Sequence, residues 1–174
     1  EKMLLRIRER DKHLSSIIDN SPDLIFIRDL QHNFQLINER FVEVMNIKQA
    51  RLIGKQAKGI LGVDLTAQLR EADQQVMQSH RPIQYKMEIE TNHGFSTFLV
   101  SKFPIIDDQG KLYSIGSIAT DITDIKQAEE QLKLAQQVFS ETAEAIIVLD
   151  NQQKVLSSNS AYIEMSGFNE LHVT

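Results

Sequence analysis

The sequence repeats part of itself at one constant offset of 121 residues, without gaps. Residues 21–38 align with residues 142–159, and Phe41 falls on Tyr162. The identical pairs are Ile25 with Ile146, Asp29 with Asp150, Gln31 with Gln152, Asn38 with Asn159 and Glu43 with Glu164. An ungapped internal repeat predicts two copies of one folded unit joined by a connecting segment. The repeat therefore limits the chain to a first unit, a connector and the beginning of a second unit.

Each copy is preceded by apolar residues at alternating intervals of three and four. Before the first copy they are Leu4, Ile7, Leu14 and Ile18, with Asp11 interrupting the series; before the second they are Ile125, Ala128, Leu132, Ala135 and Phe139. This spacing predicts helices whose apolar seam faces a partner helix, as in a coiled coil. Two heptads are fewer than a firm coiled-coil assignment requires, so a helix packed on its own domain is the alternative.

These patterns predict the domain boundaries. A linker helix covers residues 1–21, a domain covers 22–121, a second linker helix covers 122–142, and a fragment of a second domain covers 143–174. The fragment has too few residues to bury a core of its own. We therefore expect the natural sequence of the second copy to be longer.

Segments with strand character flank a helical middle. Strands are predicted at Leu24–Asp29, Phe34–Ile37, Ile83–Glu90, Phe95–Ile106 and Leu112–Thr120. Between the second and third of these, apolar residues recur at helical spacing from Asp64 or Thr66 to Ser79. This order predicts an α+β fold with one antiparallel sheet and helices on one of its faces. A cavity for a small molecule would lie between the sheet and the helices.

The last predicted strand runs into a helix with almost no loop. Residues from Thr123 onward are mostly good helix formers, whereas 113–120 are rich in β-branched and small residues. We expect Asp121 to tie the end of the strand, and Thr123 or Asp124 to cap the helix. The functional hypothesis for these three residues is a signal relay from strand to helix. The alternative is a structural cap that switches nothing.

Charge and composition exclude several classes of function. The net charge is −5 at pH 7 and the basic residues are scattered, so a nucleic-acid surface is not expected. The chain has no cysteine, which excludes disulfides, thiol nucleophiles and cysteine-ligated metals. No apolar run approaches the length of a membrane-spanning helix.

No residue pattern predicts catalysis or a metal site. The acidic pair Asp107 and Asp108 is explained by a hairpin turn that ends at Gly110. The histidines lack the i, i+4 spacing of helical zinc sites, and we expect all of them at the surface or in turns. They are His13, His32, His80, His93 and His172. The chain is therefore predicted not to be an enzyme.

Several short motifs, taken in their order, resemble a PAS domain. They are Asp23–Asp29, Asn38 followed by Arg40 and Phe41, Leu99–Pro104, Asp108–Gly110 and Gly116–Thr123. The similarity covers Leu14–Gln131, and its first third recurs at Phe139–Phe168. The resemblance implies a five-stranded antiparallel sheet of order 2-1-5-4-3 with helices over a ligand pocket. It also implies a sensor or dimerisation role in a bacterial signalling protein.

The resemblance suggests which residues could line a ligand pocket. The candidates are Phe26, Phe41, Met45, Leu69, Ala72, Val76, Leu99, Ser101 and Ile118. A plain hydrophobic core without a ligand is the alternative. Haem-binding relatives carry a histidine where this sequence has Ala72, and flavin photosensors of this fold need a cysteine. No cofactor is therefore predicted, and an unidentified small ligand remains the candidate.

The resemblance finally implies a signalling role. The module would bind a small ligand or partner and relay its state through the helix after Thr123 to a downstream effector in the same polypeptide. The effector implied is a histidine kinase or a cyclic-dinucleotide enzyme, and its motifs are not in this chain. The module is expected to be a cytoplasmic homodimer, with or without a membrane anchor elsewhere in the full-length protein. The alternative is a ligand-free dimerisation spacer.

Overall fold

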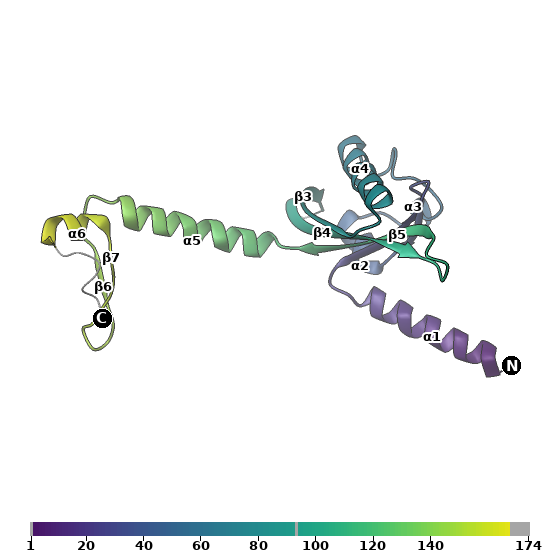
Figure 1. The fold of residues 1–174 in the computed structure, drawn as a ribbon, viewed down its shortest axis with the longest axis horizontal. Coiled ribbons are helices and arrows are strands. Elements are labelled where there is room, and N and C mark those ends of the chain that lie inside the picture. Colours follow the sequence, from purple (N-terminus) through teal and green to yellow (C-terminus); the bar gives the residue numbers. More distant parts are fainter. Residues whose placement is uncertain (1, 93, 168–174) are drawn as a thin grey trace. The chain divides into compact units, whose positions relative to one another are not determined.

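A five-stranded sheet forms the centre of the first part of the chain (Figure 1). The computed structural model describes residues 2–92 and 94–167. The elements up to the end of the sheet are α1 (Lys2–Asp19), β1 (Leu24–Asp29), β2 (Phe34–Ile37), α2 (Glu39–Met45), α3 (Gln49–Leu52), α4 (Val63–Ser79), β3 (Ile83–Thr91), β4 (Gly94–Ile106) and β5 (Leu112–Asp121). The predicted strands are confirmed, and β3, β4 and β5 are each one residue longer than the pattern indicated.

The strand order is β2-β1-β5-β4-β3, and every neighbouring pair is antiparallel. This is the order that the resemblance implied. The first residue of β1, Leu24, lies opposite Ala119 near the end of β5. The neighbouring strands β1 and β5 therefore bring the end of α1 and the start of the helix that follows β5 to the same end of the sheet.

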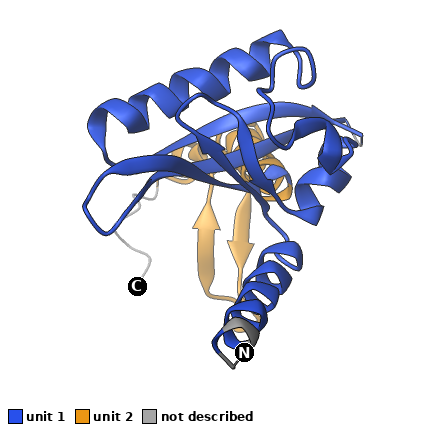
Figure 2. Ribbon diagram, turned by 90° about the vertical axis from the view of Figure 1, so that its right-hand side faces the viewer, with its two compact units in different colours: residues 1–123 blue, residues 124–174 orange. Residues whose placement is uncertain are grey.

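One face of the sheet is covered by helices, with α4 lying across it (Figures 1 and 2). Three aromatic rings pack against one another at the centre of this layer, those of Phe26, Phe34 and Phe41, with centroids 5.4–5.9 Å apart. Leu52 of α3 is fully buried with them. Burying each such side chain contributes about 1.5–3 kcal/mol, so this layer supplies much of the stability.

The chain divides into two compact units, Glu1–Thr123 and Asp124–Thr174 (Figure 2). The second unit contains nearly all of α5 (Thr123–Glu141). It continues with β6 (Ile147–Leu149), β7 (Val155–Ser158) and α6 (Ser160–Ser166). Strands β6 and β7 pair as an antiparallel hairpin. The last seven residues of the predicted second-domain fragment lie outside the described residues.

The repeat found in the sequence recurs in the hydrogen bonds of the two units. Asn38 Oδ1 accepts from the backbone N–H groups of Ile25 and Phe41. Asn159 Oδ1 accepts from the corresponding N–H groups of Ile146 and Tyr162. The hairpin turns also match, since the carboxylates of Asp29 and Asp150 each accept from the N–H groups two and four residues later. The second unit therefore starts as a copy of the first.

Candidate functional site

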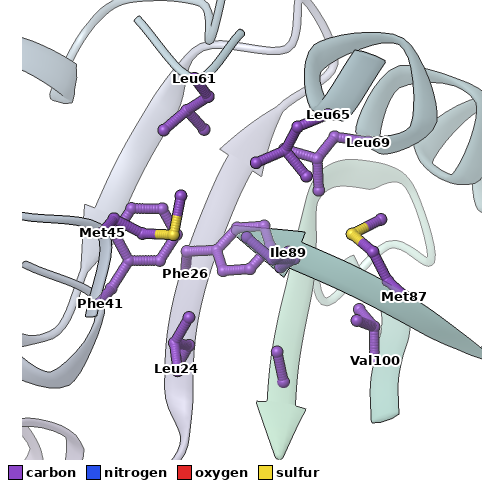
Figure 3. A pocket seen from close by; sticks show the side chains of 11 residues that line it. Leu24, Phe26, Phe41, Met45, Leu61, Leu65, Leu69, Met87, Ile89 and Val100 are labelled. Atoms are coloured by element: carbon purple, nitrogen blue, oxygen red, sulfur yellow. The ribbon is translucent and has the colours of Figure 1, made fainter. Parts of the chain in front are cut away.

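An apolar cavity lies between the sheet and the helices of the first unit (Figure 3). It is lined by Leu24, Phe26, Phe41, Met45, Leu61, Leu65, Leu69, Met87, Ile89, Val100 and Ala119. Its volume is about 20 Å³, which is close to the space of one water molecule. Pockets that bind small organic ligands are about 300–1,000 Å³. The side chains themselves therefore fill the apolar centre.

The structure brings together four of the nine predicted pocket residues: Phe26, Phe41, Met45 and Leu69 line the cavity. Ala72 and Val76 are buried on α4 but do not line it. Leu99, Ser101 and Ile118 lie on the opposite face of the sheet, because Val100 and Ala119 take the inward positions and successive residues of a strand alternate. Ser101 instead accepts a hydrogen bond from the Gln84 side chain at 3.0 Å.

A cluster of buried charged side chains surrounds Asp73 of α4. Its carboxylate is fully buried, and Oδ1 accepts a hydrogen bond from Lys102 Nζ at 2.6 Å. The other oxygen, Oδ2, lies 3.0 Å from Arg28 Nη1 and 3.1 Å from His32 Nδ1. Lys102 also donates to Ser117 Oγ at 3.0 Å. We call these five residues, together with Tyr85, the Asp73 cluster.

The cluster holds more positive than negative charge. Arg28 and Lys102 are each at most 1% exposed and share one carboxylate, that of Asp73. Burial lowers the pKa of Lys102 and of Arg28, and the attraction of Asp73 offsets this only in part. Two aromatic rings supply further stabilisation, because Lys102 lies 5.1 Å from the Phe26 ring centre and Arg28 lies 5.3 Å from that of Phe34.

Two polar atoms of the cluster are buried without a hydrogen bond, namely Arg28 Nη1 and Tyr85 Oη. Arg28 Nη1 lies 3.0 Å from Asp73 Oδ2 and forms an ion pair with it, without a hydrogen bond. The other two guanidinium nitrogens of Arg28 donate to the carbonyl oxygen of His32 at 3.1 Å. Burial also raises the pKa of the Tyr85 phenol, so it remains a donor.

The cluster was not predicted from the sequence, although Ala72, the neighbour of Asp73, was a pocket candidate. A signal was present in β1, where the inward positions are Leu24, Phe26 and then Arg28. A charged residue at the next inward position of an apolar strand must either be buried or mark the end of the strand. The prediction for His32 was half right, since it lies in a turn but is buried against Asp73.

Two other histidines, His13 and His80, lie in the described part of the chain and take part in no cluster there. His13 and His80 are exposed, and His93 and His172 lie outside the described residues. Across residues 2–92 and 94–167 no group of side chains is arranged to hold a metal ion. In the same ranges no helix is long and apolar enough to cross a membrane.

The strand-to-helix junction forms a small hydrogen-bond network. Asp121 Oδ1 accepts from the backbone N–H of Thr123 at 2.9 Å and from its hydroxyl at 2.5 Å. The Thr123 hydroxyl oxygen accepts from the backbone N–H of Thr97 in β4 at 2.9 Å, and the N–H of Ile122 donates to the Thr97 carbonyl. Asp124 lies in the first turn of α5. The first residue of α5 is thus bonded to two strands of the sheet.

The predicted seam residues lie on α1 and α5. Ile7, Leu14, Ile125 and Leu132 are 48–62% exposed. Ile18 and Phe139 are half-buried, and the side chain of Leu4 is outside the described set. The coiled coil itself stays a prediction.

Comparison with known proteins identifies the family. The family model of the PAS fold matches residues 18–127, which is more than half of the chain. The chain belongs to the PAS family. A PAS domain of BvgS from Bordetella pertussis has the same fold, with a TM-score of 0.58 and 18% identity over 74% of this chain and 98% of that one. VqmA bound to DPO superposes with a TM-score of 0.56 and 19% identity over 63% of this chain and 56% of that one.

Two curated relatives are sensory signalling proteins. The methanogenesis regulatory histidine kinase FilI of Methanothrix harundinacea is 31% identical over 136 residues, or 78% of this chain. The aerobic respiration control sensor protein ArcB of Escherichia coli is 23% identical over 128 residues, or 73% of this chain. The matched region spans only 15% and 16% of the lengths of these two relatives. The PAS domain is therefore homologous to those of sensor kinases, which supports a sensory signalling role.

Proposed function

We propose that this PAS module binds a small ligand or partner and relays its state through α5 to an effector domain in the same polypeptide. The observation that carries the proposal is the junction at Thr123, whose hydroxyl joins the first residue of α5 to β4 and to the end of β5. A shift of these strands must move the helix start, because no loop lies between them. The kinase relatives support a histidine kinase as effector.

The remaining parts of the proposal concern what the module itself does. It catalyses no reaction, uses no haem or flavin, and works in the cytoplasm as a homodimer. VqmA bound to DPO is an example of this fold in a protein that binds a partner. The filled apolar centre favours the competing function, a ligand-free spacer. A ligand-free spacer gives the junction no signalling role. Substitutions at the junction therefore distinguish the relay from the spacer.

Thr123→Val is expected to change effector output by more than it changes stability. Valine keeps the side-chain shape but removes the hydroxyl that Asp121 and the Thr97 N–H share. The loss of these two hydrogen bonds, one of which leaves the Thr97 N–H without its acceptor, should cost about 1–3 kcal/mol. Autophosphorylation or other effector output of the full-length protein would be compared with its unfolding midpoint.

The matched control is Thr120→Val, at an exposed position on β5 three residues before Thr123. It should leave both output and unfolding midpoint close to those of the wild type. A Thr123→Val protein whose output falls only in proportion to its unfolded fraction would show that the junction is a structural cap.

Cysteine cross-linking would test the parallel homodimer. The chain has no natural cysteine, so a single Leu132→Cys variant reports on one position. We expect it to form a disulfide-linked dimer efficiently, whereas Lys133→Cys, which is exposed but off the seam, should react far less. Equal yields for the two variants, or a monomer at tens of micromolar in light scattering, would contradict the seam.

A further inference from the structure

We propose that the Asp73 cluster and the adjoining apolar cavity form one binding site for a small organic anion with an apolar body. This inference rests on the proposed function and names the chemical class of its ligand. The carboxylate, or an equivalent anionic oxygen, would bind between Tyr85, Arg28 and Lys102. The apolar body would lie on the side of Phe26.

The two halves of the site are built by the same elements. On each of four strands a residue that lines the cavity is two positions from a cluster residue, so both point to the same face. The pairs are Phe26 with Arg28, Met87 with Tyr85, Val100 with Lys102 and Ala119 with Ser117. On α4, Leu69 lines the cavity and Asp73 follows one turn later. The apolar lining of the cavity is thus directly continuous with the cationic side chains of the Asp73 cluster.

The charges of the cluster favour a further anion. Two cations with fixed positions share one carboxylate, and both oxygens of Asp73 are already engaged. The lowered pKa values of Lys102 and Arg28 reflect the same shortage of negative charge, because burial of each cation outweighs the attraction of Asp73. A ligand carboxylate would restore charge balance in a region where charge interactions are weakly screened.

One donor in the cluster lacks an acceptor, and a second is held only by an ion pair. Tyr85 Oη is buried without a hydrogen bond, which is destabilising, and Arg28 Nη1 lies 3.0 Å from Asp73 Oδ2 without forming a hydrogen bond to it. One carboxylate accepts several hydrogen bonds, so it can serve both donors. Tyr85 additionally lines an open groove of about 260 Å³ between α4 and β3, together with Ala72 and Gln75. The groove would bring a ligand from solvent as far as Tyr85.

At the offset of 121 residues the second unit has Leu149 in place of Arg28 and Gln153 in place of His32. Its hairpin and asparagine bonds are nevertheless the same as in the first unit. Arg28 and His32 therefore have no charged or imidazole counterpart at these two positions of the second copy, which fits a role for them beyond closing the hairpin.

The apolar half must adapt to its ligand. The cavity of about 20 Å³ holds no organic group of useful size. Met45 and Met87, which line it, have flexible side chains that repack at little cost. Displacement of these methionines would press on α4 and on β3, and β3 pairs with the β4 strand that bonds to Thr123. Ligand binding would reach the junction by this route.

Binding can be tested with simple carboxylates as probes. Sodium formate, propionate, benzoate and phosphate would be titrated into the chain at constant ionic strength, with calorimetry and thermal unfolding as readouts. Benzoate or propionate should raise the melting temperature by several degrees, and formate and phosphate by less. Tyr85→Phe and Lys102→Met should each weaken benzoate binding at least tenfold, whereas Tyr113→Phe, an exposed tyrosine on β5, should not.

The Tyr85→Phe variant keeps the test decisive. It removes one buried hydroxyl that has no partner, so the variant should melt at the same temperature as the wild type or higher. The proposal falls if no carboxylate stabilises the wild type more than sodium chloride does, or if Tyr85→Phe binds equally well. Equal stabilisation by formate, phosphate and benzoate would overturn the role of the apolar half. Failure to bind leaves the relay to be judged on effector output of Thr123→Val.

Discussion

Replacing Asp73 with leucine is expected to destabilise the first unit by about 3–5 kcal/mol, because it leaves two buried cations without a counter-charge. Asp73 is the carboxylate that Arg28 and Lys102 share, and all three side chains are at most 1% exposed. Urea unfolding followed by circular dichroism would measure the loss as a lower midpoint at unchanged slope.

The triple variant Arg28→Leu, Asp73→Leu, Lys102→Met is the control for this effect. It removes the three charges together and leaves apolar side chains in their place, so most of the lost stability should return. The second unit already has leucine at the position of Arg28. A triple variant as unstable as Asp73→Leu would show that packing around α4, and not unpaired charge, caused the loss. A stable triple variant that no longer binds carboxylates would separate the ligand site from the fold.

The fold was predictable because its signals are local. The turn at Asp107 and the strand-to-helix change at Thr123 each depend on a few neighbouring residues, and each was found where expected. The sheet order needed more, since long-range pairing leaves no mark on a single sequence. The order came from the family resemblance.

The site was harder because it depends on which face of a strand is buried. Strand β4 has apolar residues on both faces, including Leu99 and Val100, so alternation alone gives two possible phases. The prediction placed Leu99 and Ser101 in the pocket. The observed register instead directs Val100 and Lys102 to the face of the sheet that the helices cover. Lys102 is fully buried only because Asp73, 29 residues earlier, meets it across the core. A pairing of that kind cannot be seen from composition or spacing.

The two copies separate what the fold needs from what the first domain adds. Both keep the asparagine, the aspartate turn and the residue of positive φ that follows it, His32 or Gln153. These features close the hairpin and start the next helix, so any copy requires them. The buried charges are absent from the corresponding β1 and turn positions of the second copy. Differences of this kind between copies indicate specialised function more reliably than shared residues do.

Asn38→Ala should cause the second large loss of stability, about 2–4 kcal/mol, because one fully buried amide holds four backbone groups. Its Oδ1 accepts from the N–H groups of Ile25 and Phe41 at 2.9 and 3.1 Å. Its Nδ2 donates to the carbonyl oxygens of Ile18 and Asp23, both at 2.9 Å. Alanine leaves all four without this partner, and urea unfolding would measure the cost.

Hydrogen exchange would show where the loss of Asn38 acts. The amides of Ile25 and Phe41 should lose protection first, since each donates directly to Asn38 Oδ1. Asn38→Ser keeps a helix cap but not the amide donor, so it should recover part of the stability. The change should also loosen α1, whose Ile18 carbonyl is bonded to Asn38.

Asn159→Ala is the internal control, because Asn159 makes three of the four corresponding bonds in the second unit. It should leave the main unfolding transition of the first unit unchanged. If Asn38→Ala cost no more than Asn159→Ala in that transition, the asparagine would be a local cap and not the point at which α1, β1 and α2 are held together. If Asn38→Ala instead lowers both stability and α1 protection, the entry helix is coupled to the sheet as firmly as the exit helix is at Thr123.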